Sequence, residues 1–135
     1  MITRDIPLRV RYYETDQMGI VHHSNYIRYY ETVRTEMLRE FGTTYREMEE
    51  HGVMLPVLDV QSHYISPAYD DDLLTIRVSL REMPKARMRF DYEIYREGDQ
   101  LINTGSVTLG FMNSITRRAC RVPAYFVKLL EPYFQ

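Results

Sequence analysis

The chain has 135 residues, of which 44% are hydrophobic and 27% are charged, and its formal net charge is −2. This length and balance predict one globular domain, residues 1–135, with enough apolar surface to bury a core. The slightly acidic charge argues against a nucleic-acid-binding protein, which is usually strongly basic, so we expect no nucleic-acid partner.

Two further features of the sequence concern location. No apolar run approaches the roughly 20 residues of a membrane-spanning helix, and the first residues lack the apolar core of a signal peptide. Cys120 is the single cysteine, so an internal disulfide is impossible. We therefore expect a cytoplasmic protein without a transmembrane segment.

The first element is predicted to be a short strand, because Leu8, Val10 and Tyr12 alternate with polar residues. It leads into a loop that carries Asp16 and Gly19 and then directly into a helix. A carboxylate that faces the first turn of a helix can supply a base or nucleophile beside unpaired backbone donors. Those are the parts needed to attack an activated carbonyl.

A long helix is predicted over residues 25–41, where the larger apolar residues are spaced by three and four. They are Tyr26, Tyr30, Val33, Met37 and Phe41. Ser24 or Asn25 can serve as the N-cap, and Gly42 follows the helix where a left-handed residue belongs. At ~1.5 Å per residue the helix is about 25 Å long and can lie along most of a sheet.

After a shorter helical piece over residues 43–51, the apolar period changes to two. Alternation over residues 73–80, 87–94 and 101–112, and more weakly over 61–65, predicts antiparallel strands joined by tight turns. Pro123 can start a final short helix that runs through Leu130. The pattern predicts an α+β fold, with one long central helix wrapped by a curved, mostly antiparallel sheet of five to six strands.

The segment from Tyr12 to Tyr26 resembles the signature of the 4-hydroxybenzoyl-CoA thioesterase-like group of the hotdog superfamily. The likeness is greatest to the acyl-CoA thioesterases encoded alongside the bacterial Tol-Pal system. The positions that carry it are Asp16, Gly19, Ile20, Val21, Asn25 and Tyr26. The sequence departs from the pattern at His22, where Tyr or Phe is common, which implies a more polar neighbouring pocket. The order of strand, long helix and several strands extends the resemblance over nearly the whole chain.

The resemblance implies an acyl-CoA thioesterase with a hotdog fold, in which Asp16 acts as general base or nucleophile. Backbone N–H groups at the start of the helix, near His23, would bind the developing oxyanion. A thioester is already activated, so a carboxylate and such donors suffice. The alternative reading of Asp16 is a loop carboxylate that caps a turn. Gly19 is expected to adopt positive φ in either case.

The histidines leave several readings open. Adjacent side chains diverge on a strand or helix, so we expect no metal to be bound by His22 and His23 together. One of them can orient substrate, bond Asp16 or assist protonation of the thiolate; His22 can equally close a turn. Asn25 can donate to the catalytic loop or cap the helix, and Tyr26 is expected to line the substrate pocket.

Basic residues offer sites for the phosphates of coenzyme A. The candidates are Arg87 with Arg89 on one predicted strand, and Arg117 with Arg118 near a later turn. The acidic run at residues 70–72 lacks the spacing of a calcium loop and is read as solvated. We expect neither a bound metal nor a cofactor.

Two other functions stay open. One is a hotdog hydratase or dehydratase, which needs a histidine paired with a carboxylate; the other is a non-catalytic acyl-CoA-binding or scaffold protein. An Asp16 that is buried and paired with an arginine would favour the scaffold. A single helix and sheet leave an edge strand to cover, so we expect a homodimer or homotetramer.

Overall fold

The computed structural model describes residues 1–134. Strand β1 (Ile2–Arg9) and a 3₁₀ helix (Tyr12–Glu14) precede helix α1 (Ser24–Phe41), helix α2 (Tyr45–Glu50) and strand β2 (Val53–Met54). Four long strands follow, namely β3 (Val57–Tyr64), β4 (Leu73–Leu80), β5 (Arg87–Arg96) and β6 (Gln100–Gly110), with a 3₁₀ turn at Glu97–Asp99 before β6. Strand β7 (Met112–Asn113), helix α3 (Ala124–Leu130) and a 3₁₀ turn (Glu131–Tyr133) come last.

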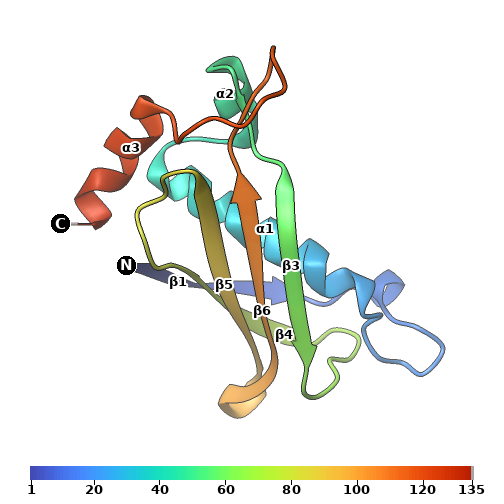
Figure 1. Ribbon diagram of the computed structural model, residues 1–135. Helices are drawn as coiled ribbons and strands as arrows, with labels where there is room; N and C mark the ends of the chain where they lie inside the picture. The colour runs from blue at the N-terminus through green and yellow to red at the C-terminus, as the bar shows by residue number, and fades with distance from the viewer. Residues whose placement is uncertain (135) are drawn as a thin grey trace.

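The main sheet has five antiparallel strands in the order β1-β4-β5-β6-β3, and β2 pairs separately with β7. Figure 1 shows the sheet strongly twisted, with α1 lying across one face and α2 and α3 near one end. The predicted α+β class, an antiparallel sheet of five strands with a helix, is confirmed. Within residues 1–134, none of the helices is both long and apolar enough to cross a membrane.

The core lies between α1 and the inner face of the sheet. Every second residue of β4 and β5 is buried, as the period-two pattern predicted. On β4 and β5 these residues are Leu74, Ile76, Val78, Leu80, Met88, Phe90, Tyr92 and Ile94. The facing side of α1 buries Tyr26, Tyr29, Tyr30, Val33, Arg34, Met37, Leu38 and Phe41. The buried face of the sheet therefore packs against the apolar stripe of α1.

Tyr30 stands at the polar centre of this core. Its ring stacks on Tyr92 with centroids 4.3 Å apart, and its hydroxyl bonds Ser62 at 2.9 Å and donates to Asn103. Burial raises the pKa of the Tyr30 hydroxyl to about 12. Gly105 makes room for this hydroxyl, because a Cβ there would press against Tyr30 and against the sheet backbone.

Of the predictions for the two ends of α1, one was right and the other was wrong. Gly42 adopts φ 102° and caps the C-terminus in the left-handed region, as predicted. The predicted N-cap was wrong: the helix begins at Ser24, so the N-cap is His23, which makes no side-chain capping bond. The reason is local. The Ser24 hydroxyl is hydrogen-bonded to the His22 ring, and the Asn25 side chain is hydrogen-bonded to Glu14 in the preceding loop, so neither side chain caps the helix.

The first strand lies earlier in the chain than the sequence predicted. Strand β1 ends at Arg9, and Tyr12 lies in the 3₁₀ helix with its side chain exposed. Arg11 and Glu14 explain the change, because the Glu14 N–H donates to the Arg11 oxygen at 3.0 Å and the Arg11 N–H donates to Glu14 Oε1 at 2.7 Å. This reciprocal pair turns the chain away from the sheet before Tyr12.

Candidate active site

Asp16 sits in a tight turn that its own backbone closes. The Gly19 N–H donates to the Asp16 oxygen at 3.0 Å, and the Asp16 N–H donates to the Ile20 oxygen at 2.9 Å. Gly19 has φ 78°, as expected, and this conformation strains residues with a Cβ. The Met18 N–H donates to Asp16 Oδ1 at 2.8 Å, which fixes one carboxylate oxygen and leaves Oδ2 for another partner. Asp16 is half-buried, within reach of both protein and solvent.

Glu14 fastens this loop to α1. Its backbone oxygen accepts from the Asn25 side chain at 2.9 Å and from the His22 N–H at 2.9 Å. Its carboxylate accepts from the Tyr29 hydroxyl at 2.8 Å. The approach to Asp16 is therefore held from the helix by both backbone and side-chain bonds. Asn25 joins the helix to the loop, which is one of its two predicted roles.

The start of α1 presents a free backbone donor. The Asn25 N–H bonds the His22 oxygen at 2.9 Å and the Tyr26 N–H bonds the His23 oxygen at 3.3 Å, so these two are occupied. Among residues 1–134, no protein atom accepts from the His23 N–H. The first N–H groups of a helix carry partial positive charge and need an outside acceptor. The His23 N–H is thus available to a ligand oxygen.

Asp16 and His23 line one cavity of about 370 Å³. Its walls come from the Asp16 loop, the first turn of α1 and the segment that follows β3. The remaining lining residues are Met18, Ile20, Val21, Tyr26, Tyr64, Ile65, Ser66 and Pro67. The Val21 N–H bonds the Ala68 oxygen at 2.8 Å, which ties the Asp16 loop to the segment after β3. A carboxylate, a backbone donor and apolar walls therefore share one hollow.

The two histidines differ from the expected arrangement. Their rings do not diverge but stack, with centroids 4.2 Å apart, because the chain turns into the helix between them. His22 Nδ1 bonds the Ser24 hydroxyl at 2.8 Å and accepts from the Ser24 N–H at 3.3 Å, so its ring closes the turn. Neither ring bonds Asp16. No group of three or more His, Cys, Asp or Glu in residues 1–134 is placed to bind a metal.

Two tyrosines beside the site keep their protons. Burial is the main cause that raises the pKa of Tyr26. Burial, followed by the hydrogen bond to Glu14, raises the pKa of Tyr29 well above its ordinary value. Both hydroxyls therefore stay neutral near pH 7, and Tyr29 remains a donor to the Glu14 carboxylate.

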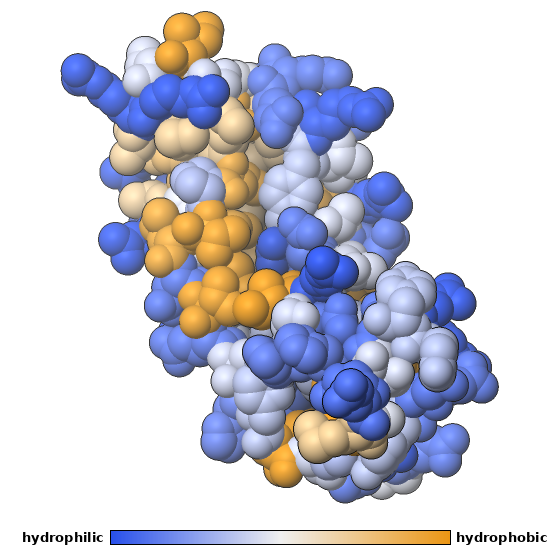
Figure 2. Space-filling view, turned by 90° about the vertical axis from the view of Figure 1, so that its right-hand side faces the viewer, coloured by the Kyte–Doolittle hydropathy of each residue, from blue (hydrophilic) through white to orange (hydrophobic). Residues whose placement is uncertain are grey.

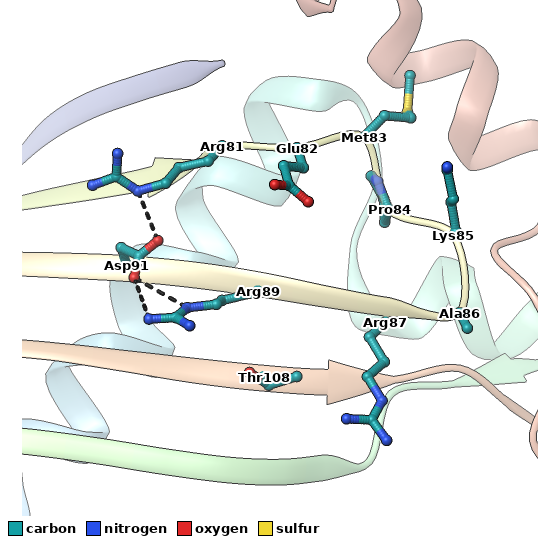
Figure 3. Close-up of a pocket in the computed structure, with 10 residues that line it drawn as sticks. All are labelled: Arg81, Glu82, Met83, Pro84, Lys85, Ala86, Arg87, Arg89, Asp91 and Thr108. Carbon is teal, nitrogen blue, oxygen red and sulfur yellow. Dashed lines mark hydrogen bonds and ion pairs between the residues drawn. The ribbon is translucent and has the colours of Figure 1, made fainter.

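Arg87 and Arg89 line a second, larger cavity of about 760 Å³, at the loop between β4 and β5 (Figure 3). Four basic side chains surround it, against the two carboxylates of Glu82 and Asp91. Arg89 donates to Asp91 at 3.1 and 3.2 Å, and Arg81 donates to the same carboxylate at 3.0 Å. Figure 3 shows Arg87 pointing away from Asp91. Among residues 1–134, Arg87 forms no ion pair.

The other predicted pair, Arg117 and Arg118, lies in the turn after β7. Both side chains are exposed, and Arg117 has φ 62°. Neither lines the cavity that holds Arg87 or the cavity that holds Asp16. The structure therefore groups Arg87 with Arg89 and keeps the second pair apart.

Tyr64 and the segment after it were missed as site residues. The weak alternation over residues 61–65 indicated a strand but gave no sign that its end faces Asp16. The signal was limited because Tyr64 lies 48 positions beyond Asp16, and only the pairing of β3 with β6 fixes its place. Apolar residues beside a serine and a proline look like an ordinary loop.

Comparison with known proteins shows which family this chain resembles. The family model of the thioesterase-like superfamily matches residues 10–130. The acyl-CoA thioesterase YbgC of Haemophilus influenzae is 31% identical over 114 residues, which cover 81% of this chain and 84% of the relative. The acyl-CoA thioester hydrolase YbgC of Escherichia coli O6:H1 is 29% identical over 121 residues, 90% of each chain.

A solved structure shows the same similarity in space. The DHNA-CoA thioesterase from Staphylococcus aureus matches with a TM-score of 0.89 at 29% identity, over 98% of this chain and 89% of that one. The family match takes in the Asp16 loop, α1 and the strands from β2 to β7. The resemblance noted in the sequence is confirmed: the chain belongs to the thioesterase-like superfamily and has its hotdog fold.

Proposed function

We propose that this protein is an acyl-CoA thioesterase, which converts an acyl-CoA and water into a carboxylic acid and free CoA. Asp16 is the general base or nucleophile, and the His23 N–H donates to the thioester oxygen. Gly19 shapes the turn, while His22, Asn25 and Tyr26 build the walls and supports of the pocket. The named activities of the relatives and the shared cavity of Asp16 and His23 support the proposal.

The reaction needs few groups. As a base, Asp16 removes a proton from water while the water oxygen forms the new bond to the carbonyl carbon. As a nucleophile, it forms a mixed anhydride that water then hydrolyses. In both routes the carbonyl oxygen gains negative charge against the His23 N–H, and the C–S bond breaks as the oxyanion collapses. Thiols have pKa values near ~8.5, so the CoA sulfur leaves with little help from an acid.

The observation that carries the proposal is that one cavity contains both the Asp16 carboxylate and the start of α1. The contacts of Asp16 also bear on the alternatives. Among residues 1–134, Asp16 is in no ion pair, whereas a scaffold protein was expected to bury it against an arginine. Neither histidine bonds Asp16, whereas a hydratase needs a histidine paired with a carboxylate. Both observations favour hydrolysis.

For the CoA end, we propose that the basic cavity of Arg87 and Arg89 receives the phosphates. Arg87 is the stronger candidate, because Asp91 already neutralises Arg89 in part. Arg117 and Arg118 stay as a second candidate patch, apart from this cavity. Phosphate oxygens are matched by the planar donors of arginine.

We propose that the protein works as a homodimer or homotetramer, in which the free edge of β3 pairs with a second copy. Strand β3 is hydrogen-bonded only to β6 within residues 1–134, so its other edge has unpaired N–H and C=O groups. Val57 is 53% exposed and Leu58 is 51% exposed on this strand. Figure 2, which views this side of the molecule, shows apolar residues gathered in a band. A second copy would bury the band and satisfy the edge.

The proposal also includes a single domain, a central helix and a cytoplasmic location. We take residues 1–135 as one hotdog domain with α1 as its central helix, which the 18-residue length of α1 and its buried face support. We place the protein in the cytoplasm, where the free thiol of Cys120 stays reduced.

The test is a panel of acyl-CoAs, short and long, aliphatic and aromatic, with free thiol measured by a chromogenic disulfide. The expected result is steady thiol release from at least one class, with the matching acid identified by mass spectrometry. Absence of thiol release across the panel would overturn the proposed function. Hydration of an enoyl-CoA without thiol release would replace it with the hydratase.

A further inference from the structure

The hydroxyl of Tyr64, at the end of β3, donates a hydrogen bond of 3.1 Å to the backbone oxygen of His23. The two residues are 41 positions apart, so a strand of the sheet reaches His23, the N-cap residue of α1. We propose that Tyr64 is a positioning residue, which holds the His23 backbone so that its N–H points at the thioester oxygen. This inference rests on the proposed function.

The start of α1 needs such a support. The N-cap of a helix is usually Ser, Thr, Asp or Asn, whose side-chain oxygen accepts a hydrogen bond from an N–H of the first turn. His23 provides no such bond. The nearest substitute is His22 Nδ1, which accepts from the Ser24 N–H at a long 3.3 Å. Without a cap the first turn of a helix frays. The backbone N–H groups of a frayed turn do not keep a fixed direction.

Tyr64 is itself well placed to supply the support. Its ring meets Tyr26 edge-on, with centroids 5.1 Å apart and an angle of 86°. It also meets the His23 ring edge-on at 6.5 Å. Tyr26 is buried, and Tyr64 is paired with Asn103 in the β3–β6 ladder. The hydroxyl therefore comes from a strand of the main sheet and not from the loop that it contacts.

The bond acts on one part of the reaction. An oxyanion donor matters most in the transition state, when the carbonyl oxygen has gained charge, and its effect depends on its position. A donor without a fixed position stabilises the transition state less, and kcat is therefore lower. The acyl group would still meet the same ring of Tyr64, so KM changes little.

The variant that tests this is Tyr64→Phe, which removes the hydroxyl and keeps the ring. The expected result is a fall of about fivefold to tenfold in kcat on the best acyl-CoA, the size of one lost hydrogen bond, with KM within about twofold. The matched control is Tyr69→Phe. Tyr69 is 42% exposed, close to the 47% of Tyr64, and its ring lies under Arg96. Tyr69→Phe should keep both constants.

A spectroscopic reading separates positioning from general damage. Asp16→Asn is expected to bind acyl-CoA but to hydrolyse it at least a hundredfold more slowly, so a ¹³C-labelled thioester carbonyl can be observed by difference infrared spectroscopy. A bond from the His23 N–H lowers the carbonyl stretching frequency below its value in water. Adding Tyr64→Phe to Asp16→Asn should move the frequency back toward that value and broaden the band. Adding Tyr69→Phe should leave it unchanged.

The outcomes are distinct. If the wild-type protein hydrolyses acyl-CoA and Tyr64→Phe keeps its kcat, the inference about Tyr64 fails while the proposed function stands. It fails as well if kcat falls but the carbonyl frequency does not move, because Tyr64 would then act elsewhere. A wild-type protein that releases no thiol removes the proposed function and this inference together.

Discussion

The side-chain nitrogen of Asn25 donates a hydrogen bond of 2.9 Å to the backbone oxygen of Glu14. This bond joins the first turn of α1 to the loop that leads to Asp16, and Asn25 is only 7% exposed. The two groups proposed to act on the thioester come from these two segments. Their relative position therefore depends on a contact between a helix and a loop, and on the Tyr29 bond that supports it.

Asn25→Ala should weaken this joint. We expect a loss of about 1–2 kcal/mol in the free energy of unfolding, because a buried hydrogen bond is removed, and a lower kcat. Urea unfolding followed by circular dichroism measures the first effect, and thiol release measures the second. Thr32→Ala is the control, since Thr32 is exposed on the same helix and bonds only the Arg28 oxygen. Equal stability of the two variants would contradict the role given to Asn25.

Asp16→Asn should abolish most thiol release while the fold persists, because the amide is nearly isosteric but is neither a base nor an anionic nucleophile. We expect at least a hundredfold loss, about the contribution of a general base. The control Asp70→Asn removes an exposed loop carboxylate and should have no effect. Near-normal turnover by Asp16→Asn, at unchanged melting temperature, would remove Asp16 from its role.

Arg87→Glu should raise KM for acyl-CoA several-fold and change kcat little, since a phosphate contact contributes equally before and during the reaction. The effect should weaken in high salt and vanish with a truncated thioester that lacks the nucleotide. Arg89→Glu should raise KM less, because Arg89 is already paired with Asp91.

Arg118→Glu tests the second patch, and Arg46→Glu, an exposed charge on α2, is the control. A larger KM effect at Arg118 than at Arg87 would transfer the phosphate site to the turn after β7. Equal losses on full-length and truncated thioesters would mean that the variants damage the fold or the catalytic site.

Leu58→Lys should dissociate the assembly, because it places a charge on the exposed apolar edge of β3. Sedimentation velocity at micromolar concentration should show a dimer or larger species for the wild-type protein and a monomer for the variant. Ile115→Lys is the control, since Ile115 is 87% exposed but belongs to the turn after β7 and not to the edge of β3. A fully active wild-type monomer would refute the proposed assembly.

Stability should fall steeply above pH 10. The pKa of Tyr30 is about 12 in the folded protein, against 10.0 for a free tyrosine. The folded state therefore holds this proton more tightly, so the stabilisation is complete below pH 10 and is lost as pH rises toward 12. Tyr30 alone contributes on the order of 2 kcal/mol to this fall, and the raised pKa of Tyr92 acts in the same direction.

Tyr30→Phe provides the check. At pH 8 it should be less stable than the wild type, because the bonds to Ser62 and Asn103 are gone. Between pH 10 and 12 its stability should decline less, because one raised pKa has been removed. Urea midpoints at pH 8, 10 and 11 measure both effects, and identical pH slopes would contradict the assignment.

The sequence by itself determined the positions of the long helix and of the long central strands. Strand β4 occupies residues 73–80 as the alternation predicted, and α1 ends at Phe41 before Gly42. These features are local, because burial on one face sets the period of apolar residues and a left-handed turn selects glycine. The spacing of Asp16 and Gly19 before a helix belongs to the same class, since it depends on a few successive residues.

The tertiary structure alone decided how those parts meet. The hydroxyl of Tyr64 reaches His23 because β3 lies beside β6 at the sheet edge, and no local pattern encodes that strand order. Arg89 is paired with Asp91, whereas Arg87 forms no ion pair within residues 1–134, although both looked alike in the sequence. Such contacts join residues that the chain separates or that strand geometry orients, so they follow from packing energies summed over the whole core and not from local propensity.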